Sequence, residues 1–202
     1  IPMDSTRVVV LAGPTQALDS TAIGRLEDYV DQGGAALILL EPILLDPQNP
    51  QPIPVYSGLE PFLEEDGLRF NSSLVADLAS SEQVSLGQRG FFNVIAPYPL
   101  WPIVSPAGDH ITTRSLSSLT LSWAGALDIV DSTMVTPLWQ TTDAAALRGP
   151  GLPILPDQNW DTPREELAVR TVAVAVDPGA ADADGESSGN TSGRMIVVGD
   201  AS

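Results

Sequence analysis

The side chains that could carry out catalysis are sparse in this sequence. It has no cysteine and one histidine, His110, which ends the polar stretch that begins at Ala107. A Ser-His-Asp triad would have to use this histidine, and no Gly-x-Ser-x-Gly elbow between a strand and a helix supports one. Amidotransferases of similar architecture need a cysteine nucleophile. We therefore expect His110 to be an ordinary surface residue and the chain not to be an enzyme.

Two carboxylates, Glu41 and Asp200, directly follow apolar runs that are typical of buried strands. In doubly wound folds, ligands bind beyond the carboxyl ends of parallel strands. We expect the residues at these ends to line one crevice, where acidic groups could bind a sugar hydroxyl, a cation or an arginine of a partner. The candidate residues are Gly13, Pro14, Thr15, Glu41, Asp200 and Ser202. The alternative is that the Gly-Pro-Thr segment is only the turn that ends a strand.

No motif predicts a cofactor or a metal. Residues 13–18 read GPTQAL, which lacks the Gly-x-Gly-x-x-Gly cradle of a dinucleotide site. Residues 182–186 (DADGE) resemble part of a calcium loop. In that alignment, however, the first and last ligand positions fall on Ala180 and Thr191, where acidic residues are needed. A solvated loop is therefore the favoured interpretation.

Trp101 stands between two prolines, and we expect it to be exposed at a contact surface. Tryptophan suits such surfaces because its ring buries a large area while its N–H can still donate a hydrogen bond. The alternative is a core position, which is usual for large aromatic side chains. The other aromatic residues considered are Tyr98, Trp123, Trp139 and Trp160.

The elements that would position the crevice begin with a strand, a helix and a second strand. Residues 7–12 (RVVVLA) and 35–40 (AALILL) are mainly apolar runs, as expected of parallel strands covered on both faces. Between them, Asp19 can cap a helix whose apolar residues recur at spacings of three and four, and Gly33 and Gly34 would end it. The pattern predicts a right-handed βαβ unit.

The remaining segments are less regular. Residues 43–56 are rich in Pro, Gln and Asn and are expected to form a loop, as are residues 143–163. A short helix is predicted over residues 58–66, ended by a glycine. Prolines in 91–104 indicate an edge strand or an extended loop, because proline has no N–H to donate to a neighbouring strand.

The C-terminal part predicts an antiparallel hairpin. Residues 166–176 and 194–198 are apolar strand candidates. Residues 177–193 between them nearly lack large apolar side chains, so a mobile loop is expected there. Further short strands are predicted at 74–77, 116–123 and 134–142.

The 202 residues include 26 acidic and 9 basic ones, all arginine, and the formal net charge is −17. Such a surface repels phosphate backbones and anionic lipids, which argues against nucleic-acid binding, although it can equally serve solubility alone. No apolar run approaches the roughly 20 residues that cross a bilayer, and the start lacks the features of a signal peptide. We expect one extracytoplasmic α/β domain over residues 1–202, cut from a longer membrane-anchored protein.

Several segments together resemble the auxiliary domain family of ABC transporters. This family includes gliding-motility transporter components, and a related domain occurs in an intraflagellar transport subunit. The matching blocks, in family order, are 8–14 (VVVLAGP), 29–42 (YVDQGGAALILLEP), 58–77 (GLEPFLEEDGLRFNSSLVAD), 97–104 (PYPLWPIV), 137–143 (PLWQTTD) and 193–202 (GRMIVVGDAS). Family members often carry a histidine where this chain has Trp101.

The resemblance implies a Rossmann-like or flavodoxin-like fold, a three-layer α/β sandwich with a mostly parallel central sheet, to which the antiparallel C-terminal hairpin is added. It also implies a domain outside the cytoplasm, carried by a membrane-anchored subunit, with the membrane subunits of an ABC transporter as partners. The family offers no catalytic residue, metal ligand or cofactor site to carry over.

Three functions are open at this point. The first is a non-catalytic domain that binds a partner or a small molecule such as a sugar. The second is a structural spacer that only orients membrane segments. The third is a hydrolase acting through carboxylates such as Glu41 and Asp200. The missing histidine and cysteine chemistry favours the first two.

Overall fold

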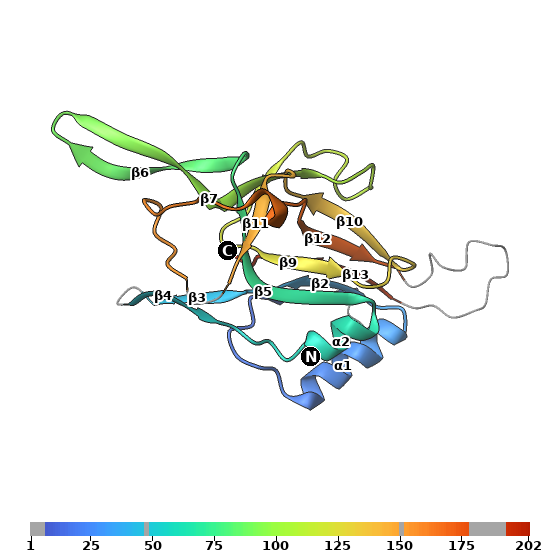
Figure 1. Cartoon of the computed structure of the whole chain (residues 1–202). Coiled ribbons are helices and arrows are strands. Elements are labelled where there is room, and N and C mark those ends of the chain that lie inside the picture. Colours follow the sequence, from blue (N-terminus) through green and yellow to red (C-terminus); the bar gives the residue numbers. More distant parts are fainter. Residues whose placement is uncertain (1–6, 47–48, 150–151, 178–192) are drawn as a thin grey trace.

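The largest sheet of the molecule has a parallel part and an antiparallel part (Figure 1). The computed structural model describes residues 7–46, 49–149, 152–177 and 193–202. In the parallel part, β1 (Val8–Ala12), β2 (Ala35–Leu39) and β13 (Arg194–Val198) are neighbours in that order. The antiparallel part follows as β12 (Thr171–Val176), β10 (Val135–Gln140), β7 (Phe92–Pro106) and β6 (Ser81–Arg89), with β8 (Leu119–Thr120) paired to β7.

The strand-helix-strand prediction at the start of the chain is confirmed. β1 pairs parallel with β2, with Val8 opposite Ala35, and α1 (Ser20–Asp31) connects them. Asp19 caps this helix, because its carboxylate accepts a 2.8 Å hydrogen bond from the N–H of Ala22. The expected antiparallel pairing of the C-terminal strands is also present, between β12 and β13.

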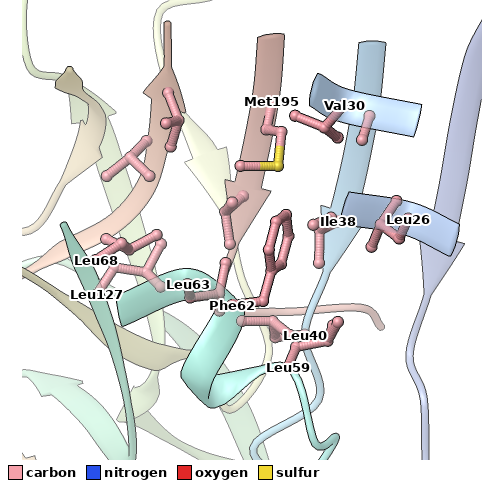
Figure 2. Packing of buried hydrophobic residues seen from close by; sticks show 14 of the residues in the cluster. Leu26, Val30, Ile38, Leu40, Leu59, Phe62, Leu63, Leu68, Leu127 and Met195 are labelled. Atoms are coloured by element: carbon pink, nitrogen blue, oxygen red, sulfur yellow. The ribbon is translucent and has the colours of Figure 1, made fainter. Parts of the chain in front are cut away.

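One face of the sheet is covered by α1 and α2 (Glu60–Glu65), which contribute to a single core cluster. Figure 2 shows Leu26 and Val30 of α1 and Phe62 of α2 packed over Ile38 of β2 and Met195 of β13. Among the described residues, no helix has both the length and the apolar character required to cross a membrane.

The expected Rossmann-like or flavodoxin-like three-layer sandwich is wrong. Strands greatly outnumber helices in the described chain, and after α2 its only helical element is the 3₁₀-helix η2 (Arg164–Glu166). Neighbouring parallel strands need a long crossover, usually a helix, and α1 is the helix that supplies one here. β13 instead arrives next to β2 as the antiparallel partner of β12. The sheet is therefore mixed, and the described helices cover one face of it.

Several predicted loops are strands. The loop expected at 43–56 forms the pair β3 (Ile43–Asp46) and β4 (Asn49–Pro54). The loop expected at 143–163 begins with a strand of a second sheet, whose order is β11 (Ala145–Arg148), β5 (Leu68–Asp77) and β9 (Gly125–Ile129). Of residues 177–193, only the two ends lie within the described residues.

The proline-rich segment 91–104 forms most of β7, which lies between β10 and β6 rather than at an edge of the sheet. Its prolines are tolerated because β10 pairs with only the last two residues of the strand, Ser105 and Pro106.

A buried carboxylate ties the end of β5 to the turn between β10 and β11. Asp77 is fully buried. Its Oδ1 accepts hydrogen bonds from the N–H groups of Ala79 and Ser80 and from the Thr142 hydroxyl, and its Oδ2 accepts one from the Thr142 N–H. A buried charge is tolerated only with such a full set of donors. Asp77 is thus a structural residue that joins the two sheets.

Removing this carboxylate should destabilise the fold strongly. In Asp77→Ala, three backbone N–H groups and one hydroxyl lose their acceptor, and we expect the free energy of unfolding to fall by about 3–5 kcal/mol. The control Asp143→Ala removes an exposed carboxylate from the same turn and should cost less than about 0.5 kcal/mol. Urea denaturation measures both, and equal losses would contradict this role of Asp77.

Candidate functional site

The three parallel strands end at one edge of the sheet, and the predicted crevice residues follow them there. Gly13 follows β1, and its N–H donates to the carbonyl of Leu39 at 2.9 Å. A Cβ on Gly13 would lie 3.1 Å from the Cβ of Ala201 and 4.0 Å from Oε2 of Glu41. Gly13 also has φ +54°, a backbone conformation that favours glycine. The strand ends therefore meet as the sequence predicted.

Asp200 is bound tightly into this edge. It is only 4% exposed. Its Oδ2 accepts a 2.6 Å hydrogen bond from the N–H of Ser122, and its Oδ1 accepts bonds from the N–H (2.9 Å) and hydroxyl (2.8 Å) of Ser202. The Ser202 hydroxyl also lies 3.3 Å from the carbonyl oxygen of Ser122. Asp200 therefore fastens the end of β13 to the segment that leads into β9.

Glu41 is the carboxyl group at this edge that remains available. Burial, and then the negative charge of Asp200, raises the pKa of Glu41 from its ordinary 4.5 to about 7. Its side chain is partly buried rather than enclosed. At neutral pH the group therefore exists in both protonation states, and it can donate or accept a hydrogen bond. We call Gly13, Glu41, Asp200 and Ser202 the strand-end site.

The other sequence candidates lie differently. Pro14 is partly buried and Thr15 is exposed, both in the turn that follows Gly13. Trp101 is partly buried in β7, not exposed at a contact surface as expected. Its ring packs edge-on against Trp123 with centroids 5.3 Å apart and against Tyr98 at 5.5 Å.

This aromatic cluster supports the strand-end site through the backbone of Trp123. That residue has φ +59°, a conformation that is strained for a large side chain. It is held by its N–H, which donates to the carbonyl of Leu100 at 2.9 Å, and by its indole N–H, which donates to the hydroxyl of Tyr98 at 2.9 Å. The preceding residue, Ser122, is thereby fixed with its N–H on Asp200. Sequence reasoning considered Trp123 only as an aromatic residue and placed neither it nor Ser122 at this site.

An apolar cavity lies on the sheet face opposite α1. Its volume is about 190 Å³. Its lining residues are Thr112, Leu119, Leu121, Leu138, Trp139, Ala173, Ile196 and Val198. Leu121 immediately precedes Ser122, and Val198 ends the strand that leads to Asp200. The cavity and the strand-end site are therefore held by the same two segments.

The chemistry available at the strand-end site is limited. Asp200 is buried and both of its oxygens are engaged, so it is not free to attack a substrate. Within the part of the chain that the structure describes, no group of three His, Cys, Asp or Glu side chains is arranged to hold a metal ion. The arrangement offers one titratable carboxyl group beside a backbone turn, which suits binding of one polar or cationic group.

Comparisons with known proteins identify a family and a similar fold. A family model described as an ABC-type uncharacterized transport system matches residues 1–202. Among solved structures, the mmIFT52 N-terminal domain has a TM-score of 0.57 and 16% sequence identity, over 98% of this chain and 68% of that one. A search of the curated proteins gives no match. The structural likeness shows the fold alone, whereas the family match confirms the resemblance seen in the sequence.

Alanine substitutions at two glycines, Gly199 and Gly24, test how closely the backbone packs beside the strand-end site. A Cβ on Gly199 would overlap the carbonyl oxygen of Gly125, a backbone atom that cannot move aside. We expect Gly199→Ala to lower the free energy of unfolding by at least about 2 kcal/mol. Gly24→Ala in α1 has open space and should be neutral or stabilise by up to about 1 kcal/mol. Thermal denaturation distinguishes them, and a Gly199→Ala protein as stable as Gly24→Ala would refute the close approach.

The raised pKa of Glu41 predicts a pH dependence of stability. The folded-state value of about 7 exceeds the ordinary 4.5, so the folded chain binds more protons than the unfolded chain, and stability is lost as the pH rises through 7. Glu41→Gln cannot ionise. We expect it to match the wild type at pH 4 and to exceed it at pH 8 by about 1–2 kcal/mol, a figure reduced for partial exposure.

Denaturation at both pH values measures this difference, with Glu165→Gln, on the exposed η2, as the matched control. The pKa of Asp66, which burial and the charges of Asp31 and Glu65 raise to about 6, affects all three proteins alike. Equal stability of Glu41→Gln and wild type at pH 8 would mean that Glu41 ionises freely.

Proposed function

We propose, since this chain belongs to the family of ABC-type uncharacterized transport systems, that it is a non-catalytic binding domain of such a transporter on the extracytoplasmic side. In this proposal the strand-end site holds a partner subunit of the transport system, or a small ligand, through the Glu41 carboxyl group. The observation that carries the proposal is the placement of this partly exposed carboxyl beside the buried Asp200.

The charge of the chain favours a basic group as the one that binds. The chain carries a formal net charge of −17, so its field attracts cations and repels anions. A guanidinium placed at Glu41 would favour the ionised carboxylate and offset the repulsion from Asp200. A partner's arginine therefore gains more from this site at neutral pH than a neutral sugar does.

Binding is supported over hydrolysis by the state of Asp200. A carboxylate pair that hydrolyses glycosidic bonds needs one group free to act as nucleophile or base. Both carboxylate oxygens of Asp200 accept hydrogen bonds, from Ser122 and Ser202, and the residue is almost fully buried. Within the described part of the strand-end site, Glu41 is then the accessible carboxyl, and it can position a group.

The proposal is tested in the intact transporter by site-specific photo-crosslinking. Thr15 is exposed in the turn beside the strand-end site, so a benzoylphenylalanine placed there reports on whatever binds. We expect a crosslink to a membrane subunit of the transporter, and we expect Glu41→Gln to lower its yield at least about fivefold because the arginine loses its counter-charge.

Two controls make the result specific. Glu165→Gln removes an equivalent charge from the exposed η2 and should leave the yield unchanged. The same crosslinker at Asp143, on the turn between β10 and β11, should not give the same product. If Glu41→Gln leaves the crosslink yield unchanged, a domain that only spaces the membrane segments would be favoured. If the protein turns over aryl glycosides and Glu41→Gln abolishes this turnover, the hydrolase would be favoured.

A further inference from the structure

The hairpin formed by β6 and β7 extends beyond the body of the molecule (Figure 1). Exposed apolar side chains lie at its end. Its outer part, residues 84–96, pairs from Val84 opposite Ala96 to Arg89 opposite Phe92. We call these residues the hairpin tip. Phe91 is fully exposed, Phe92 is 78% exposed and Ile95 is 59% exposed. Exposed aromatic side chains gathered at one projecting end indicate a binding surface.

Charge separates the hairpin tip from the rest of the chain. Asp and Glu make up 26 of the 202 residues, yet none occurs between Glu82 and Asp109. The tip itself carries one charged residue, Arg89. The −17 charge of the chain therefore lies outside this arm, and the arm is the part that can approach a lipid headgroup without strong repulsion.

The apolar side chains lie on both faces of the hairpin. Successive residues of a strand point to opposite faces, so Phe92 and Ile95, three residues apart, point away from each other. Both are exposed. A groove on a protein would cover one face and leave the other in water, whereas a bilayer surrounds whatever enters it. The arrangement therefore favours lipid over a protein groove.

Some polar groups behind the turn bond to one another within the hairpin. The Ser85 hydroxyl donates to Oδ1 of Asn93 at 2.6 Å, and the N–H of Gly87 donates to the Ser85 hydroxyl at 3.2 Å. The cross-strand ladder satisfies further backbone groups. The ladder next to the turn runs from Gln88 opposite Asn93 to Arg89 opposite Phe92, and this pairing lowers the cost of moving the end of the hairpin out of water, which otherwise prevents irregular backbone from entering lipid.

We propose that the hairpin tip inserts Phe91 and Phe92 into the interfacial region of a lipid bilayer. At roughly 3.3 Å per residue, Ile95 lies about 13 Å behind the turn. Interfacial elements enter to a depth of roughly 5–10 Å. The two phenylalanines therefore enter the membrane, Ile95 lies within the headgroup layer that surrounds both faces of the hairpin, and the acidic body stays in water. This proposal does not depend on the strand-end site.

Flotation of the 202-residue chain with phosphatidylcholine vesicles tests the proposal. We expect the wild type to float with the vesicles and Phe91→Ser/Phe92→Ser to partition about a hundredfold more weakly, because each of the two buried rings contributes about a factor of ten. The matched control is Val8→Thr/Val10→Thr, which removes two exposed apolar side chains from β1 and should float like the wild type. Melting temperatures should be unchanged in the Phe variant, because both rings lie in solvent.

Vesicle charge supplies a second, independent readout. The body is negative, so adding phosphatidylglycerol should weaken binding at low salt, and added salt should restore it. Binding that instead strengthens with phosphatidylglycerol would overturn the proposal. So would a wild type that stays with the lipid-free fraction, which would assign the tip to a pocket on a partner protein. Equal flotation of the Phe variant, or loss in the β1 control, would overturn it as well.

Insertion can also be observed directly at the tip. The chain has no cysteine, so a single Phe91→Cys takes an environment-sensitive dye at one site. We expect its emission to shift to the blue with vesicles, while the same dye on Ser118→Cys, at an exposed position of the body, stays unshifted. A shift at Ser118 and none at position 91 would contradict insertion of the hairpin.

Discussion

Strand β13, which follows the other strands in the sequence, pairs on one side with β2 and on the other with β12. Ile196 stands opposite Leu37 in the parallel pairing and opposite Ala175 in the antiparallel one. The N-terminal strand-helix-strand unit meets the antiparallel strands through this double pairing. Because β13 is parallel to β2, its carboxyl end brings Asp200 to the edge where Glu41 lies, so the strand-end site depends on this pairing as much as the fold does.

The packing beyond the end of β13 explains why Asp200 is held rigidly in the strand-end site whereas Glu41 remains accessible. Gly199 donates to the carbonyl of Val172 at 2.8 Å and accepts from the N–H of Gly125 at 2.7 Å, which is possible because neither glycine has a Cβ. Asp200 then meets Ser122, whose position follows from the left-handed backbone of Trp123. Glu41 has no comparable set of donors among the bonds that define this edge. Burial, and then the fixed negative charge of Asp200, therefore raise the pKa of the Glu41 carboxyl group, an arrangement suited to binding.

Local patterns in the sequence predicted the elements that depend on local interactions. The apolar runs around α1, its Asp19 cap and the meeting of Gly13, Glu41 and Asp200 at one edge followed from periodicity and from the geometry of parallel strands. The predicted fold class was wrong because the residues of a strand do not by themselves specify which other strands it pairs with. β4 (NPQPIP) and β6 (SEQVSLGQR) lack apolar runs and exist through pairing with β3 and β7. Ser122 could not be foreseen because it lies 78 residues from Asp200.

The pairing of β13 with both β2 and β12 is decisive for the strand-end site, and nuclear Overhauser contacts between backbone protons measure it directly. In a labelled sample of the chain, β13 should show contacts on both sides, from Val197 to Ile38 of β2 and from Val197 to Val174 of β12. Contacts from β13 to β12 alone, with β2 lacking a partner other than β1, would contradict the account. The strand-end site would then lose the geometry that unites Glu41 with Asp200.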